Sequence, residues 1–286
     1  MFSHPITKGV NGTPQIPGDK SISHRSIIIP SVSNGISEIN NILKSDDVNH
    51  TLNAFKSMGV KIIEEDNKII IYGNGLNSLK KPKDKIYLGN SGTSARLLTG
   101  LLSSQKFDSV LTGDNSLSKR PMKRISDPLI KMNAKIDTTN GSLPIIIKGN
   151  KLNSSNIDLT IPSAQIKSGL LLAGLNTSGE TTISEYKVTR DHTEIMLKAF
   201  GANIEIDKFN DKKQIKIVGQ KELVSKNIDV PNDLSSSAFF IVSALINNNS
   251  NVILKNINNN PTRNGLILAL NKMGANIELK NKKLSN

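Results

Sequence analysis

Phe200-Gly-Ala-Asn-Ile204 and Met273-Gly-Ala-Asn-Ile277 are two of four related phrases that recur along the chain. The other two are Met58-Gly-Val-Lys-Ile62 and Met132-Asn-Ala-Lys-Ile136, and successive phrases begin 74, 68 and 73 residues apart. Each phrase closes a stretch in which apolar residues recur at helical spacing, and its Gly or Asn is typical of a helix end. A nearly constant period of this length predicts one supersecondary unit repeated along the chain.

Strands are predicted after the first three phrases, where apolar runs end at or beside a glycine. These runs are Lys68–Gly73, Leu143–Gly149 and Gln214–Gly219. A second helix family precedes the phrases, with polar entries and apolar bodies that are typical of buried, capped helices. The entries lie near Ser21, Ser91, Ser163 and Ser235.

The predicted unit is therefore strand, helix, strand, helix, strand, strand. It is repeated three times, and a fourth copy reaches Asn286 before its closing strands, as expected of a fragment. Such alternation predicts an α/β fold in which helices and sheets form layers.

Composition narrows the class of protein. The chain has 286 residues, 36% apolar and 21% charged, which excludes disordered, collagen-like and membrane-spanning proteins. Because cysteine is absent, disulfides, thiolate zinc sites and cysteine nucleophiles are excluded too. The first residues contain no apolar signal segment, so the cytoplasm is the expected compartment.

The formal net charge of +13 allows either a nucleic-acid surface or a site for small anions. Aromatic residues make up only 3% of the chain, too few for base stacking, so nucleic acid is not expected as a partner. Because the chain has no long apolar run, no membrane is expected as a partner either. Lysines outnumber arginines 31 to 6. The arginines are therefore informative, because only arginine grips phosphate or carboxylate with two parallel donors.

The densest polar cluster is Pro17-Gly-Asp-Lys-Ser-Ile-Ser-His-Arg25. It places Lys20 and Arg25 near the start of a predicted buried helix, where the helix dipole repels cations. An anion that neutralises them is the favoured explanation, and a solvated turn conflicts with the apolar run that follows. Several such N-termini would together form an anion site, although an ordinary Ser or Thr cap is the simpler interpretation of any single one.

Other clusters also begin predicted helices. Leu88-Gly-Asn-Ser-Gly-Thr-Ser-Ala-Arg96 contains Gly92, which would let the backbone approach a ligand, but the phrase lacks the ending of a P-loop. In Lys119–Arg124, Arg120 is expected to face an anion and Arg124 to lie on a helix surface.

For Ser163–Lys167 the sequence offers a hydroxyl and an amide at a helix start. For Arg190 and the following aspartate, a structural ion pair or cap is a strong alternative. Neither His24 nor His192 has a second ligand at metal spacing, so a core or surface position is expected for both.

Together with Asn260-Pro-Thr-Arg263, these phrases resemble the 5-enolpyruvylshikimate-3-phosphate synthase family, in the same order over nearly the whole chain. The resemblance implies two similar domains of βαβαββ units with the active site between them. It assigns a complete domain to residues 18–228 and a partial one to residues 1–17 plus 229–286. It also implies transfer of the enolpyruvyl group of phosphoenolpyruvate to the 5-hydroxyl of shikimate 3-phosphate, with release of phosphate and without a cofactor or metal.

Residue roles follow from the same resemblance. Lys20 would contact both substrates and be the one catalytic residue present, because the family's acid–base residues lie in a C-terminal part outside these 286 residues. The chain alone is therefore expected to be inactive. The implied ligands of shikimate 3-phosphate are Lys20, Ser21, Arg25, Ser163, the backbone of Ala164, Gln165 and Arg190. Those of phosphoenolpyruvate are Lys20, Gly92, Arg120 and Gln165.

Two alternatives stay open at this point. The sister transferase acting on UDP-N-acetylglucosamine usually has a reactive cysteine and a Lys-Asn pair near its start, where this chain has no cysteine and Lys20-Ser21. The other alternative is a non-catalytic, anion-binding relative. The sequence leaves the oligomeric state open, with a monomer favoured.

Overall fold

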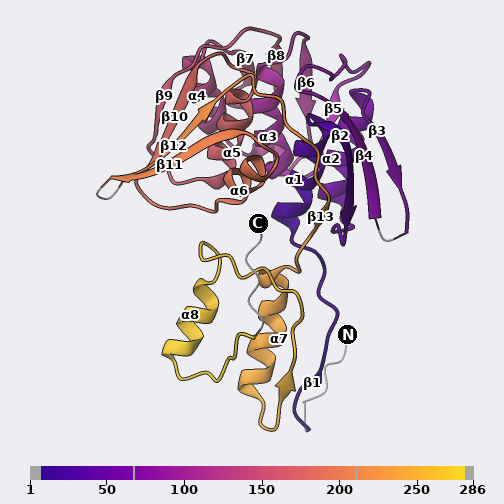
Figure 1. Ribbon diagram of the computed structural model, residues 1–286, viewed down its shortest axis with the longest axis vertical. Coiled ribbons are helices and arrows are strands. Elements are labelled where there is room, and N and C mark those ends of the chain that lie inside the picture. The colour runs from indigo at the N-terminus through magenta and orange to yellow at the C-terminus, as the bar shows by residue number, and fades with distance from the viewer. Residues whose placement is uncertain (1–7, 67, 210–211, 281–286) are drawn as a thin grey trace.

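Two lobes make up the computed structural model, which describes residues 8–66, 68–209 and 212–280 (Figure 1). The larger lobe holds the elements from α1 (Lys20–Ser31) to β13 (Ile228–Asp229). The smaller lobe holds β1 (Asn11–Gly12), α7 (Leu234–Ile246), β14 (Asn251–Val252) and α8 (Gly265–Lys272). One buried apolar cluster runs through the larger lobe, and a second, centred on Leu234, Ile241 and Ile267, lies in the smaller lobe. Each lobe therefore has its own core.

Three four-stranded sheets lie on the outside of the larger lobe, around its helices (Figure 1). Each sheet has one parallel pair at one edge and antiparallel pairs elsewhere. In one sheet the spatial order is β5 (Ile86–Tyr87), β6 (Ser109–Thr112), β8 (Ser142–Lys148) and β7 (Lys135–Thr139). In another it is β9 (Asn156–Leu159), β10 (Glu180–Glu185), β12 (Lys212–Val218) and β11 (Asn203–Phe209). In the third it is β13 (Ile228–Asp229), β2 (Asn34–Asn40), β4 (Lys68–Asn74) and β3 (Lys61–Glu64). The order within the sheets is the same, as the sequence repeat predicts.

The first unit differs from the prediction in its leading strand. The chain enters the larger lobe directly into α1 (Lys20–Ser31), and the leading position is filled by β13, which pairs in parallel with β2. β13 is the last strand of the larger lobe along the chain. The segment that enters the lobe before α1 therefore lies beside the segment that leaves it after β13, and we call these two segments the chain crossings. The Asp19 amide donates to the Pro231 carbonyl at 2.8 Å, and the Asp233 amide donates to the Pro17 carbonyl at 2.9 Å.

Three of the four helices predicted to be buried fill the interior: α1, α3 (Gly92–Ser103) and α5 (Ala164–Gly174). The prediction was wrong for the fourth, α7, which begins near Ser235 and has most of its apolar side chains on the surface. Ser91 and Ser163 are the N-caps of α3 and α5, but α1 is capped by Asp19, because Ser21 lies inside its first turn. The outer helices of the same lobe are α2 (Asp46–Ser57), α4 (Lys123–Lys131) and α6 (His192–Ala199), and a short 3-10 turn, η1 (Leu117–Lys119), precedes α4.

Helices α3 and α5 approach each other through glycine. A methyl group placed on Gly100 would lie 1.9 Å from the carbonyl oxygen of Gly169, and one on Gly169 would lie 2.7 Å from the carbonyl oxygen of Arg96. Both neighbours are backbone atoms, which cannot swing aside as a side chain can. This contact sets the distance between the two helices whose N-termini face the candidate site.

The smaller lobe consists of β1 (Asn11–Gly12) paired in parallel with β14 (Asn251–Val252), together with α7 (Leu234–Ile246) and α8 (Gly265–Lys272). Asp233 caps α7 by accepting hydrogen bonds from the amides of Ser235 and Ser236. Apolar side chains of α7 lie on the surface, with Phe239 78% and Ile246 75% exposed. In the described part of the chain, no helix combines the length and apolar content that a membrane crossing requires.

Candidate active site

A cavity of about 320 Å³ opens beside the N-termini of α1, α3 and α5. Its lining residues are Lys20, Asp47, Asn90, Gly92, Thr93, Arg120 and Gln165. The structure thus gathers four residues singled out from the sequence, Lys20, Gly92, Arg120 and Gln165, from segments up to 145 residues apart. Free backbone N–H groups at helix N-termini and two cationic side chains make this cavity suitable for anions.

The Lys20 ammonium group pairs with the carboxylate of Asp47, in the first turn of α2. The Lys20 side chain is 48% exposed, so its ammonium group is accessible from the cavity. Sequence reasoning missed Asp47, because an aspartate in the first turn of a helix is adequately explained by the helix dipole. Only the fold brings α2 beside the start of α1.

Arg96 forms the wall between α3 and α5. Its Nη1 donates to the Gly92 carbonyl and to Oε1 of Gln165, each at 3.0 Å, while Nε2 of Gln165 donates to Thr93 Oγ1 at 3.0 Å. Burial lowers the pKa of Arg96, and the nearby charges of Arg120 and Arg124 lower it further. Arg96 was not selected from the sequence, although its being one of only six arginines was a signal for it.

Arg120 donates to Oδ1 of Asn90, and both residues line the cavity. Arg124 is the second residue of α4 and is solvent-exposed, as expected for a helix-surface residue. Of these two arginines, only Arg120 lines the cavity.

Gly92 lies where two guanidinium groups meet. A methyl group at this position would lie 2.8 Å from Arg96 Nη1 and 2.9 Å from Arg120 Nη1. Such distances are shorter than carbon–nitrogen contacts in proteins, so both arginines would have to move. The backbone at Gly92 thus allows Arg96 and Arg120 to approach the same space.

We expect Gly92→Ala to leave the fold intact but to displace both guanidinium groups, since these are the flexible ends of long side chains. If phosphoenolpyruvate is the anion that this cavity holds, it should bind about tenfold more weakly, which corresponds to about 1.4 kcal/mol. Isothermal titration of the variant measures this, with Gly265→Ala as the control because a methyl group there contacts nothing within 4 Å. If Gly92→Ala bound phosphoenolpyruvate as tightly as the parent chain, Gly92 would not be part of the binding site.

Arg25 does not line the cavity. Its side chain is buried, and it donates to Thr193 Oγ1 at 2.6 Å, Ser168 Oγ at 2.7 Å and the Ser21 carbonyl at 2.7 Å. Burial lowers the pKa of Arg25 to about 10, partly opposed by the charge of Glu194. Three of its five N–H groups are therefore committed to the protein, and two remain for a ligand.

Behind Arg25 lies a buried group of four ionised side chains that we call the ion cluster: Lys167 of α5, Glu185 of β10, Glu194 of α6 and Lys213 of β12. Lys167 Nζ lies 3.0 Å from Glu185 Oε1 and 2.7 Å from Glu194 Oε1, and Lys213 Nζ lies 3.6 and 3.5 Å from the same atoms. Two positive and two negative charges balance within the core. The cluster holds α6 beside α5 next to Thr193, the Arg25 partner.

The remaining predicted ligands lie at helix starts. Ser163 caps α5 by accepting from the Ile166 amide at 3.4 Å, and Ala164 is the first residue of that helix. Ser21 lies in the first turn of α1. Arg190 is solvent-exposed and precedes α6; partial burial and the charge of Arg263 lower its pKa.

His24 and His192 are both core residues. His24 Nδ1 lies 2.8 Å from Thr51 Oγ1, and burial, reinforced by the charge of Arg25, lowers its pKa to about 3. Burial and the same arginine lower the pKa of His192 to about 4. Among the residues described, no group of three His, Asp or Glu side chains could hold a metal ion.

Comparison with known proteins identifies the family of this chain. The family model described as EPSP synthase (3-phosphoshikimate 1-carboxyvinyltransferase) matches residues 5–285. The chain belongs to the EPSP synthase family. It is 50% identical to the 3-phosphoshikimate 1-carboxyvinyltransferase of Ruthia magnifica subsp. Calyptogena magnifica over 278 residues, which are 97% of this chain and 63% of that relative.

Other EPSP synthase relatives agree. The 3-phosphoshikimate 1-carboxyvinyltransferase of Bacillus cytotoxicus is 44% identical over 94% of this chain and 63% of its own length. A solved structure of EPSP synthase from Acinetobacter baumannii superposes with a TM-score of 0.91 at 47% identity, over 98% of this chain and 63% of that one. The chain thus spans a little under two thirds of the length of these relatives. The comparisons give no support to the UDP-N-acetylglucosamine alternative.

Proposed function

We propose that this chain supplies the phosphoenolpyruvate-binding and part of the shikimate 3-phosphate-binding surface of an enzyme that transfers an enolpyruvyl group to the 5-hydroxyl of shikimate 3-phosphate. The observation that carries the proposal is the cavity in which Lys20, Gly92, Arg120 and Gln165 meet. Both substrates are anions, and this cavity is lined by two cations, one carboxylate and helix N-termini. The proposed setting is the cytoplasm.

In this proposal Arg120 grips the anionic end of phosphoenolpyruvate, with Gly92 allowing close approach. Lys20 lies between the two substrates, where its ammonium group stabilises negative charge that develops during addition. Gln165, fixed by Arg96 and Thr93, orients the substrates from the α5 side. Addition to the enol and elimination of phosphate require proton transfers, and the proposed role of this chain is binding and charge stabilisation.

Shikimate 3-phosphate would lie along the starts of α1, α5 and α6. Its proposed ligands are Ser21, Arg25, Ser163, the backbone of Ala164 and Arg190, of which Arg190 is exposed and available. We further propose residues 18–228 as a complete domain and residues 1–17 plus 229–286 as part of a second one. The separate buried cores of the two lobes support this division.

The binding proposal is tested by calorimetry on the 286-residue chain. Shikimate 3-phosphate should bind and raise Tm, and shikimate, which lacks the phosphate, should do neither at the same concentration, because ligand that binds only the native state stabilises it. If shikimate and shikimate 3-phosphate behave alike, or neither binds, the proposed site is wrong.

A sharper test concerns the forked donor of Arg120. Arg120→Lys keeps the charge but cannot make two parallel N–H bonds, which should cost about 1.5–3 kcal/mol for a charge-assisted contact. This corresponds to a roughly tenfold to hundredfold rise in Kd for phosphoenolpyruvate, with shikimate 3-phosphate affected much less.

Arg124→Lys is the matched control, because the same exchange is made on the exposed face of α4 outside the cavity. Its titration curves should overlay those of the parent chain. Equal losses in Arg120→Lys and Arg124→Lys would mean that only the general positive field matters.

A further inference from the structure

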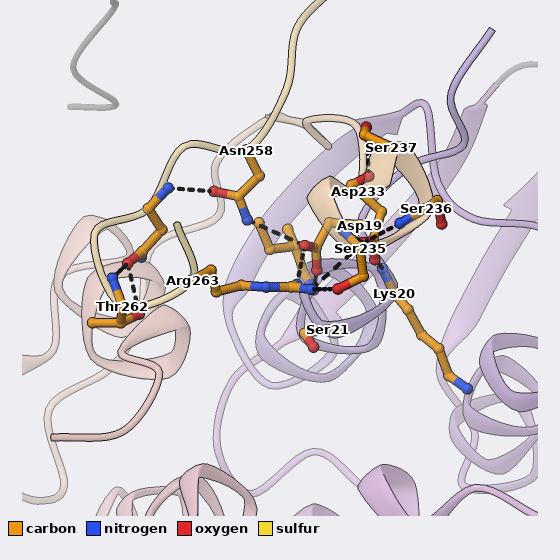
Figure 2. Close-up of polar contacts among 12 residues, drawn as sticks. Asp19, Lys20, Ser21, Asp233, Ser235, Ser236, Ser237, Asn258, Thr262 and Arg263 are labelled. Atoms are coloured by element: carbon orange, nitrogen blue, oxygen red, sulfur yellow. Dashed lines mark hydrogen bonds and ion pairs between the residues drawn. The ribbon is translucent and has the colours of Figure 1, made fainter. Parts of the chain in front are cut away.

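The loop from Asn258 to Asn264, between β14 and α8, contacts the N-termini of three helices in both lobes. Figure 2 shows it beside the cap residues of two of them, Asp19 and Asp233. We call it the bridging loop. It contains Asn260-Pro-Thr-Arg263, a phrase that the proposed binding site does not use. Its side chains contact the cap residues of α1, α6 and α7. Along the chain, α6 begins 172 residues after α1, and α7 begins 42 residues after α6.

Arg263 is the centre of this contact. Its side chain is 5% exposed, and Nη1 pairs with Oδ2 of Asp19, the cap of α1. The Nη2 group lies 3.5 Å from Oδ1 of Asp233, the cap of α7, and donates to Ser235 Oγ at 2.6 Å. Figure 2 shows the side chain reaching both helix starts.

The two aspartates connect Arg263 to the backbone of both helices. Asp19 Oδ1 accepts from the Ile22 amide at 3.0 Å, and Asp233 Oδ1 accepts from the Ser235 amide at 2.6 Å. Asp233 Oδ2 also accepts from the Lys20 amide at 3.3 Å, so the cap of α7 contacts the backbone of α1. Asn258 Nδ2 adds a bond to Asp19 Oδ2 at 3.2 Å.

A second contact of the same loop reaches α6. Asn260 Nδ2 donates to Oδ1 of Asp191, the α6 cap, at 2.7 Å. Along the chain, Asp191 lies between Arg190 and Thr193, the hydrogen-bond partner of Arg25. The bridging loop therefore fixes the starts of α1 and α6 relative to each other.

We propose that Arg263 is a positioning residue for the anion site: by holding the caps of α1 and α7 together, it fixes the first turn of α1 and so the place of Lys20 and Ser21. Lys20 follows Asp19 directly, and its amide is bonded to Asp233. Its side chain extends away from Arg263 (Figure 2). Its ammonium group pairs with Asp47. Arg263 thus acts on the site through the α1 backbone, and this inference rests on the function proposed above.

The test separates position from stability. Arg263→Gln leaves two buried carboxylates without their cation, so Tm should fall. In Arg263→Gln/Asp233→Asn one of those charges is gone and Asn still caps a helix well, so most of the loss in Tm should be recovered. The contact between the two caps remains broken in the double variant.

Two readouts at a temperature well below Tm decide the matter. Hydrogen exchange at the Ile22 amide should be at least tenfold faster in both variants than in the parent chain, and Kd for shikimate 3-phosphate should be about tenfold higher. Arg263→Lys, which keeps the charge but cannot span both carboxylates, should give intermediate values. Lys272→Gln removes one positive charge from the exposed end of α8 in the same lobe and should match the parent in both readouts.

Recovery of exchange rate and affinity together with Tm in the double variant would show a structural role only and overturn the inference. Unchanged exchange and affinity in Arg263→Gln would overturn it directly. If the parent chain fails to bind shikimate 3-phosphate, the proposed function fails, and hydrogen exchange at Ile22 still decides whether Arg263 positions α1.

Discussion

Gly100→Ala is expected to destabilise the chain by about 3 kcal/mol, at the upper end for overpacking of a close-packed core. The added methyl group would lie 1.9 Å from the Gly169 carbonyl oxygen, so α3 and α5 would have to separate. Their N-termini face the cavity, so the separation should also weaken binding of phosphoenolpyruvate, the ligand proposed for it. Urea unfolding followed by circular dichroism gives the change in the free energy of unfolding.

Gly265→Ala is the control for this variant. Nothing lies within 4 Å of the added methyl group, and alanine is a better helix former than glycine, so stability should stay the same or rise by a few tenths of a kcal/mol. A Gly100→Ala chain as stable as the parent would mean that α3 and α5 can separate freely, contrary to the rigid contact described above.

Lys167→Met should cost about 3–5 kcal/mol, because removing one member of a buried ion pair leaves its partners as uncompensated charges. Lys213 would then face Glu185 and Glu194 alone, from 3.5–3.6 Å. Urea unfolding measures the loss. Lys167→Met/Glu194→Gln, in which the charges of the ion cluster balance again, should recover more than half of it.

Lys216→Met provides the matched comparison. Lys216 pairs with Asp207 at 2.9 Å on the surface of the same lobe, where solvent screens the charges, so its loss should change stability little. If Lys167→Met and Lys216→Met behaved alike, the ion cluster would contribute no more than a surface pair.

The helices and inner strands of the larger lobe were predictable because their signals are local. Apolar spacing and the recurring phrase that begins with Met132 or Phe200 depend only on neighbouring residues, and the structure confirms the elements that they predict in the larger lobe. By contrast, β13 fills the leading position of the first sheet from a distant segment. No local pattern at Ile228–Asp229 encodes that pairing.

The same limit applies to the site. Lys20, Gly92 and Arg120 could be selected from the sequence as a cation at a helix start, a glycine before a helix and one of six arginines. All three line the same cavity. Asp47 could not, since only packing of α2 against α1 makes it a partner of Lys20. The protein contacts of Arg25 could not be predicted either, since its partners Thr193 and Ser168 lie on other helices.

The neighbouring chain crossings have a consequence for the topology of the larger lobe. The Asp19 and Asp233 amides donate to the carbonyls of Pro231 and Pro17, so the points where the chain enters and leaves are hydrogen-bonded to each other. A polypeptide whose entry and exit coincide can be closed into a ring by a short linker and reopened at an exposed turn elsewhere. A circular permutant of residues 18–232 should therefore keep all three sheets, with β13 still paired beside β2.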